Sequence, residues 1–124
     1  MMKYEILKDV TRTVEGQTVH RIRALRDIPR HGVKAGDLGG WVASEFSLDQ
    51  EGDAWVAGDA CVYDHAVVSG DARVCDCARV FGRAAVYGKA WVTGSAWVFD
   101  DAHVFGNVHV YGSLRVCGSR RWGN

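Results

Sequence analysis

The 124-residue chain has few of the features that mark secreted, membrane or flexible proteins. It has a single proline, Pro29, so little linker is expected. The N-terminus, from Met1 to Ile6, lacks the apolar run of a signal peptide. No segment approaches the roughly 20 apolar residues that a membrane-spanning helix needs. Together with a formal net charge of zero, these absences predict one soluble, cytoplasmic domain that does not enter a membrane.

Motifs that carry chemistry are also scarce. Only four cysteines occur, at positions 61, 75, 77 and 117, and free thiols in a reducing compartment are the default for such a chain. The pair Cys75 and Cys77 is at best half of a metal site, and no second pair has zinc-ligand spacing. No glycine loop of phosphate-binding type and no Ser/His/Asp or Cys/His arrangement is supported by spacing. We therefore expect no metal, no cofactor and no catalytic residues.

What the chain does contain is a short repeat. Eleven consecutive six-residue units of the form (Gly/Asp)-x-Ala-x-Val-x run from Gly52 to Cys117 without an insertion. The Val position is Val in all eleven units, and the Ala position is Ala in nine, with Val108 and Leu114 in the last two. A strict short period of this kind predicts a solenoid, in which each repeat stacks only on its neighbours.

The spacing within a unit predicts short strands. Residues two apart point to the same face of a strand, so Ala54 and Val56 face inward while Trp55 and Ala57 face outward. Gly or Asp then makes a corner, because both tolerate positive φ. Three units would complete a triangular turn of 18 residues around a narrow axis that holds only Ala and Val. The expected fold is an all-β triangular β-helix.

The two ends depart from the repeat. Residues 1–35 are predicted to form a small β cap, with a hairpin turn within Val14–Val19. Residues 36–124 would form about four to five coils, of which 36–51 is a degenerate first turn. Subtracting 18 places Leu38 under Val56, Val42 under Ala60 and Leu48 under Ala66. At the other end, Trp122 follows the inward Val column and is the candidate plug of the open core.

Charge is segregated along the chain. Residues 1–35 hold eight Lys/Arg and four Asp/Glu, residues 36–76 hold one and nine, and residues 77–124 hold six and two. The net charges are therefore +4, −8 and +4. Two interpretations remain open: the acidic residues are solvated corners, or they form a belt that attracts a basic partner or orders subunits.

The outward positions carry the aromatic residues. An 18-residue period aligns Trp55, Arg73, Trp91 and His109 on one face, and Cys61, Arg79, Trp97 and Arg115 on the next, flanked by Tyr63, Phe81, Phe99 and Cys117. The third face carries Val67, Ala85, His103 and Arg121, flanked by Ser69, Tyr87, Phe105 and Gly123. On an isolated prism these rings would meet water, and exposed apolar area of that size marks an interface.

These faces suggest two uses. The first is self-association into a homo-oligomer, with a trimer favoured. The second is binding of a host protein or a nucleotide, because arginine and tryptophan side chains can hold a phosphate and stack on a base. Zero net charge and the acidic segment argue against duplex DNA. The candidate binding residues are Trp55, Arg73, Trp91, Arg79, Trp97, Arg115, Phe81 and Phe99.

The repeat resembles that of the hexapeptide-repeat, left-handed β-helix proteins over roughly residues 38–118. It departs from that family's usual unit because Gly stands two places after Val, as in Val56-Ala57-Gly58. The resemblance implies a left-handed coil. Three N-terminal segments, Tyr4–Leu7, Arg21–Leu25 and Lys34–Val42, followed by these repeats, look like small phage and prophage proteins. That likeness implies a viral accessory protein in the cytoplasm of a bacterial host.

Three functions are consistent with these observations. The leading expectation is a non-catalytic oligomeric binding protein that blocks or sequesters a host component, for which counter-defence is a natural role. The second is an enzyme of the acyltransferase type, which the resemblance implies along with γ-type carbonic anhydrases. Its candidate bases are His65, His103 and His109, but the last two lie on adjacent faces, and no substrate loop interrupts residues 52–117. The third is a structural protein that assembles into a particle or fibre.

Overall fold

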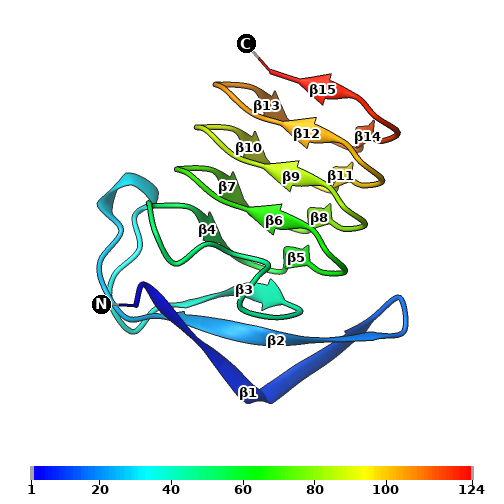
Figure 1. Ribbon diagram of the computed structural model, residues 1–124. Helices are drawn as coiled ribbons and strands as arrows, with labels where there is room; N and C mark the ends of the chain where they lie inside the picture. Colours follow the sequence, from blue (N-terminus) through cyan, green and yellow to red (C-terminus); the bar gives the residue numbers. More distant parts are fainter. Residues whose placement is uncertain (1, 124) are drawn as a thin grey trace.

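The structure is a computed structural model, and it describes residues 2–123. Apart from one 3-10 turn, η1 (Pro29–His31), every element within these residues is a β-strand. Figure 1 shows a stack of triangular coils with an antiparallel hairpin across its lower end. The predicted all-β solenoid is therefore confirmed. We use "lower" for the direction toward the hairpin and "upper" for the direction toward the C-terminus.

The hairpin consists of β1 (Tyr4–Val14) and β2 (Gln17–Ala24). Its turn residues Glu15 and Gly16 have φ values of 52° and 76°, which suits a two-residue turn between twisted strands. β2 also pairs antiparallel with β3 (Leu38–Val42), and β3 pairs parallel with β5 (Cys61–Val62). The cap and the coils thus share one seven-stranded sheet, and one core cluster extends from Tyr4 to Val116.

The walls of the coils are two-residue strands that stack in three parallel sheets. The first is β4 (Trp55–Val56), β7 (Arg73–Val74), β10 (Trp91–Val92) and β13 (His109–Val110). The second continues from β5 through β8 (Arg79–Val80), β11 (Trp97–Val98) and β14 (Arg115–Val116). The third is β6 (Val67–Val68), β9 (Ala85–Val86), β12 (His103–Val104) and β15 (Arg121–Trp122). We call their outward sides the β4 face, the β5 face and the β6 face.

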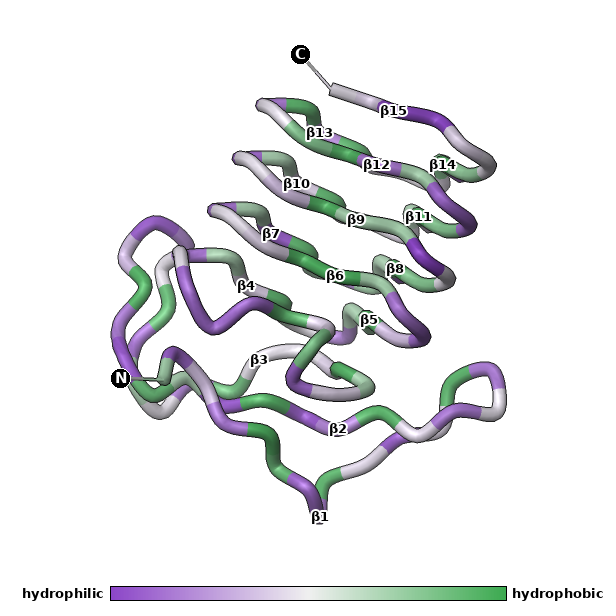
Figure 2. The backbone as a smooth tube through the Cα atoms, viewed as in Figure 1, coloured by the Kyte–Doolittle hydropathy of each residue, from purple (hydrophilic) through white to green (hydrophobic). Residues whose placement is uncertain are grey.

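The interior follows the predicted code. The inward Val residues from Val56 to Val116 are each 0% exposed, and the inward Ala residues from Ala54 to Ala102 are almost as buried. Figure 2 shows the resulting pattern, with hydrophobic residues on the strands from β4 to β14 and mostly hydrophilic residues at the corners. Burying one Val side chain stabilises a protein by roughly 1.5–3 kcal/mol. The stacked Val columns are therefore the main source of stability in the coils.

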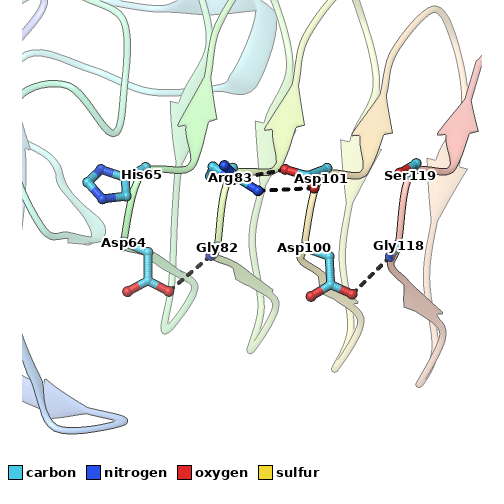
Figure 3. A pocket seen from close by; sticks show the side chains of 8 residues that line it. All are labelled: Asp64, His65, Gly82, Arg83, Asp100, Asp101, Gly118 and Ser119. Atoms are coloured by element: carbon cyan, nitrogen blue, oxygen red, sulfur yellow. Dashed lines mark hydrogen bonds and ion pairs between the residues drawn. The ribbon is translucent and has the colours of Figure 1, made fainter.

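The corners explain why each unit begins with Gly or Asp. Every one of these positions from Gly52 to Gly118 has positive φ, including Asp64, Asp76 and Asp100 at 58°, 60° and 61°. Each of the three Asp side chains accepts a hydrogen bond of 3.0 Å from the backbone N–H of the glycine one coil above. Figure 3 shows two of these bonds, Asp64 with Gly82 and Asp100 with Gly118. Asp is tolerated at a corner because its carboxylate is used there.

The predicted register of the first turn is wrong. Val42 pairs with Val62 and Leu48 with Val68, an offset of 20 residues rather than 18. The offset returns to 18 by Gly52, which stacks on Gly70. The two additional residues thus lie between Leu48 and Gly52. There the Gln50 amide accepts from the backbone N–H groups of Lys3 and Tyr4, at 2.8 and 3.2 Å, and so attaches β1 to the coil.

Two further expectations about the ends need correction. Leu38 does not lie under Val56, because it pairs antiparallel with Arg23 and is 54% exposed. The space beneath Val56 is occupied by Gly40, where an added Cβ would lie 2.7 Å from Val56 Cγ1. Trp122 does pair with Val104 at the upper end, as its column predicted, but 38% of its surface stays exposed. As a plug it covers the core only in part.

Candidate binding surface

The β4 face contains the first predicted column in register, with Trp55, Arg73, Trp91 and His109 on successive coils. The structure does not leave all of them in water. Trp55 is 1% exposed and belongs to the same core cluster as Ile22 of the hairpin. An added Cβ on Gly39 would lie 2.7 Å from Trp55 Cζ2, so glycine is what makes room for this ring. Trp55 is therefore a core residue of the monomer and not part of its surface.

The segment that contains η1 lies against the next two residues of this column. Arg73 donates a hydrogen bond of 2.9 Å to the His31 carbonyl, and His31 Nε2 donates one of 3.1 Å to the Asp71 carbonyl. The His31 ring meets Trp91 edge-on at 6.4 Å. Burial, followed by the Arg73 charge, lowers the pKa of His31, and its Nδ1 atom is buried without a hydrogen-bond partner. Above this contact the face is open, with Trp91 41% and Tyr111 60% exposed.

The centre of the β5 face is a tryptophan between two arginines. The Arg79 and Arg115 guanidinium carbons lie 5.3 and 4.3 Å from the Trp97 ring centroid, one coil below and one above. Both are within cation–π range. Arg79 also pairs with Glu15 of the hairpin turn at 3.3 Å. Arg115 instead donates to the backbone carbonyls of Ser95, Ser113 and Leu114, at 3.1, 2.9 and 3.2 Å.

Beside this column the flanking rings form a continuous ladder. Phe81 stacks on Tyr63 with 5.1 Å between centroids and on Phe99 with 5.0 Å, in nearly parallel planes. Both faces of Phe81 are thus covered by stacked rings, and guanidinium groups from the coils below and above lie near the Trp97 ring. Phe99 stacks on Phe81 below it, and the equivalent residue one coil above is Cys117 rather than a ring. A base stacked on Trp97, as expected from the sequence, would compete with these two guanidinium groups for the ring.

The lower part of the β5 face is covered by the chain itself. Val14 and Val19, on either side of the hairpin turn, cluster with Trp41, Cys61 and Tyr63, and Phe81 packs against this cluster. Tyr63 is 1% exposed as a result. The upper part is made of Phe81, Trp97, Phe99 and Arg115, and within residues 2–123 only Phe81, at its lower border, packs against the hairpin cluster. The three rings are half-buried and Arg115 is exposed. We refer to these four residues as the upper β5 face.

The acidic segment has its basic partner within the same chain. Arg26 and Arg30 of the cap pair with Asp53 at 3.3 and 3.6 Å, and Arg30 also reaches Asp71 at 3.5 Å. Arg12 of β1 pairs with Asp59 at 3.5 Å, and Gln17 donates to Asp64. The charge segregation in the sequence therefore reflects docking of a basic cap on acidic corners. Sequence reasoning did not find these pairs, although opposite net charges of neighbouring segments were their signal.

The three candidate histidines, His65, His103 and His109, lie apart from one another within the chain. His103 meets the Tyr87 hydroxyl at 3.3 Å on the β6 face, whereas His109 meets the Thr93 hydroxyl at 2.8 Å on the β4 face. His65 lies exposed at a corner. Within residues 2–123, no three His, Cys, Asp or Glu side chains come together in a way that could hold a metal ion. All four cysteines are free, and burial raises the pKa of the Cys61 thiol.

A groove of about 590 Å³ lies along the corner between the β5 and β6 faces. Its carboxylates are engaged within the fold: Asp64 and Asp100 accept from glycine N–H groups one coil above, and Asp101 pairs with Arg83 at 2.9 Å. Figure 3 shows these interactions along the corner. Since each carboxylate already has a structural partner, this groove is a weaker candidate than the upper β5 face.

Comparison with known proteins adds no family to this picture. No protein-family model matches the sequence, and no curated protein matches it significantly. In the part of the chain that the structure describes, no helix has the length and apolarity to cross a bilayer. The assignment of the candidate binding surface therefore rests on the geometry of the upper β5 face alone.

Proposed function

We propose that this chain is a non-catalytic binding protein that contacts a host protein through the upper β5 face. The observation that carries the proposal is the guanidinium–indole–guanidinium column of Arg79, Trp97 and Arg115 beside the half-buried rings of Phe81 and Phe99. Tryptophan, aromatic rings and arginine dominate binding energy at protein interfaces. Here they stand together on one flat face of a rigid solenoid.

Binding is favoured over catalysis because the carboxylates already have partners within the fold and the histidines lie apart. The corner carboxylates accept backbone hydrogen bonds or pair with arginines, and His103 and His109 lie on different faces. The repeats also run from Gly52 to Cys117 with no loop that would close over a substrate. A site for general acid–base work needs titratable groups within reach of one another.

A protein partner is favoured over a nucleotide by the orientation of the rings. Both faces of Phe81 are occupied by stacked rings, and two guanidinium groups lie within cation–π range of the Trp97 ring. Base recognition by stacking needs a free ring face. Half-buried rings and guanidinium N–H groups instead suit aliphatic side chains and carboxylates of a protein.

We place self-association on a different face. The upper part of the β4 face exposes Trp91 and Tyr111 by 41% and 60%, and exposed apolar area of this kind marks an interface. A homo-oligomer, with a trimer as the favoured form, would cover this part of the β4 face and leave the upper β5 face free. In this proposal the chain acts as a phage-type accessory protein in a bacterial cytoplasm and blocks a host component, with counter-defence as its role.

The test is capture from bacterial lysate. Immobilised wild-type protein should retain a specific host protein, identified by mass spectrometry, and the double variant Trp97→Ala, Phe99→Ala should lose it. Arg83→Gln is the matched control, because this exposed arginine lies at a corner outside the surface. Circular dichroism would confirm that all variants fold. Retention that is equal for wild type and the double variant, or no retention above an unrelated solenoid, would refute the proposal.

A further inference from the structure

One segment of the chain, the hairpin turn, already packs against the β5 face. The hairpin turn lays Val14 and Val19 against Tyr63 and the edge of the ladder. Between these two valines, Glu15 pairs with Arg79 at 3.3 Å. A β segment with two branched aliphatic side chains and one carboxylate thus already occupies the lower part of this face.

The upper β5 face repeats the same chemistry without a cover. Arg115 stands two coils above Arg79 in the same column, and Phe99 stands one coil above Phe81. Arg79 has a carboxylate partner, whereas none of the ion pairs within residues 2–123 includes Arg115. Among the described residues its guanidinium donates hydrogen bonds to neutral carbonyls, and charge-assisted bonds to a carboxylate are about twice as strong as neutral ones.

The height of the upper β5 face matches the width of such a segment. Two coil steps of about 4.8 Å each separate Arg79 from Arg115, which equals the spacing of about two additional strands. A segment docked there would lie beside the chain's own hairpin and continue its packing. A second copy of this chain does not supply the segment, because its hairpin turn is already held on its own β5 face by Val14, Val19 and Glu15.

We infer that the upper β5 face binds an extended or hairpin segment of a protein partner that presents branched aliphatic side chains and a carboxylate. The aliphatic groups pack on the rings of Phe81 and Phe99, and the carboxylate pairs with Arg115. The inference builds on the proposed function, since it names the chemistry of the partner at the same surface. The partner thus mimics the hairpin turn that the chain itself carries.

A synthetic peptide can test this directly. The probe is a backbone-cyclised peptide with the sequence of residues 11–20, Thr-Arg-Thr-Val-Glu-Gly-Gln-Thr-Val-His. Titrated into the isotope-labelled full chain up to millimolar concentration, it should shift the Trp97 indole N–H signal and the amide signals of β11 and β14. The same peptide with Glu15→Gln should bind about tenfold more weakly, the loss expected for one charge-assisted bond.

Variants of the full chain complete a double-mutant cycle between Arg115 and the glutamate of the peptide. Arg115→Gln should bind both peptides with equal, weakened affinity, while Arg83→Gln should preserve the tenfold difference. The inference is overturned by equal affinity of the two peptides for the wild-type chain, by no saturable shift, or by shifts confined to the β4 or β6 face. Release of Val19 and Tyr63 signals, which would indicate displacement of the internal hairpin, also overturns it.

The two proposals fail in different ways. If lysate capture depends on Trp97 and Phe99 but the peptide does not bind, the surface is an interface for a different chemistry. If the peptide binds with the predicted selectivity but lysate yields no partner, the recognition chemistry stands and the proposed host target falls.

Discussion

Asp76 accepts a hydrogen bond of 3.0 Å from the backbone N–H of Gly94, one coil above it, while its own backbone adopts a φ of 60°. One residue thus makes a corner and joins two coils. Substitution can separate these contributions, because Asn keeps an acceptor and tolerates positive φ, Gly keeps only the backbone freedom, and Ala keeps neither.

Stability should therefore fall in the order Asp76, Asp76→Asn, Asp76→Gly, Asp76→Ala. We expect a loss of about 1 kcal/mol for Gly from the missing hydrogen bond. For Ala we expect about 2 kcal/mol, since left-handed strain adds to that loss. Urea unfolding followed by circular dichroism measures both. Equal stability of the Gly and Ala variants would contradict the role of backbone conformation.

Gly40→Ala should destabilise the first coil by about 3 kcal/mol, the upper range for overpacking. An added Cβ would lie 2.7 Å from both the Ala60 carbonyl and Val56 Cγ1, and neither the backbone nor a fully buried Val can move away easily. Thermal unfolding measures the loss, and hydrogen exchange should locate the increased opening in β3 and β5. A Gly40→Ala variant as stable as wild type would contradict the prediction.

Lys3 should make the protein more stable as the pH rises above 8. The side chain is 0% exposed and donates to the Ala54 carbonyl at 2.7 Å. Burial, with the Arg26 charge as a smaller cause, lowers the pKa of Lys3 from 10.5 to about 8. Between these values the unfolded chain binds more protons than the folded one, so raising the pH favours folding.

The measurement is a comparison with Lys3→Met, which cannot titrate. From pH 7 to pH 10 the stability of wild type should gain about 2 kcal/mol relative to the variant. Burial raises the pKa values of Tyr4, Cys61 and Tyr63, which acts in the opposite direction. These groups are common to both proteins, so their effect is removed by the difference. Parallel pH profiles would contradict the prediction.

Acid should loosen the segment around His31. The pKa of this side chain is lowered below 6.5 by burial and then by Arg73, so the folded state favours the neutral ring. As the pH falls below 6.5, the unfolded state binds a proton first and stability is lost. The variant His31→Gln keeps a donor for the Asp71 carbonyl and should lose less stability than wild type over this pH range. Denaturant unfolding at pH 7 and pH 5, with hydrogen exchange at Val33, tests this.

The repeat made the coils predictable, and long-range packing made the cap unpredictable. The inward Ala and Val and the outward columns through Trp91 and Trp97 follow from one period that no insertion disturbs. The burial of Trp55 does not follow, because it depends on a β3 glycine and on Ile22 of the hairpin. Likewise, the 20-residue offset accompanies a hydrogen bond between Gln50 and the start of β1. The six-residue period does not predict this contact.

The pairing of Glu15 with Arg79 spans 64 residues of sequence. Because synthesis proceeds from the N-terminus, the hairpin leaves the ribosome before the coils that receive it exist. Val14, Val19 and Glu15 cannot pack until the strands that contain Tyr63 and Arg79 have been synthesised. The hairpin therefore reaches its final place only after Arg79 has been synthesised, and until then the lower end of the growing stack keeps an open strand edge that favours association with other chains.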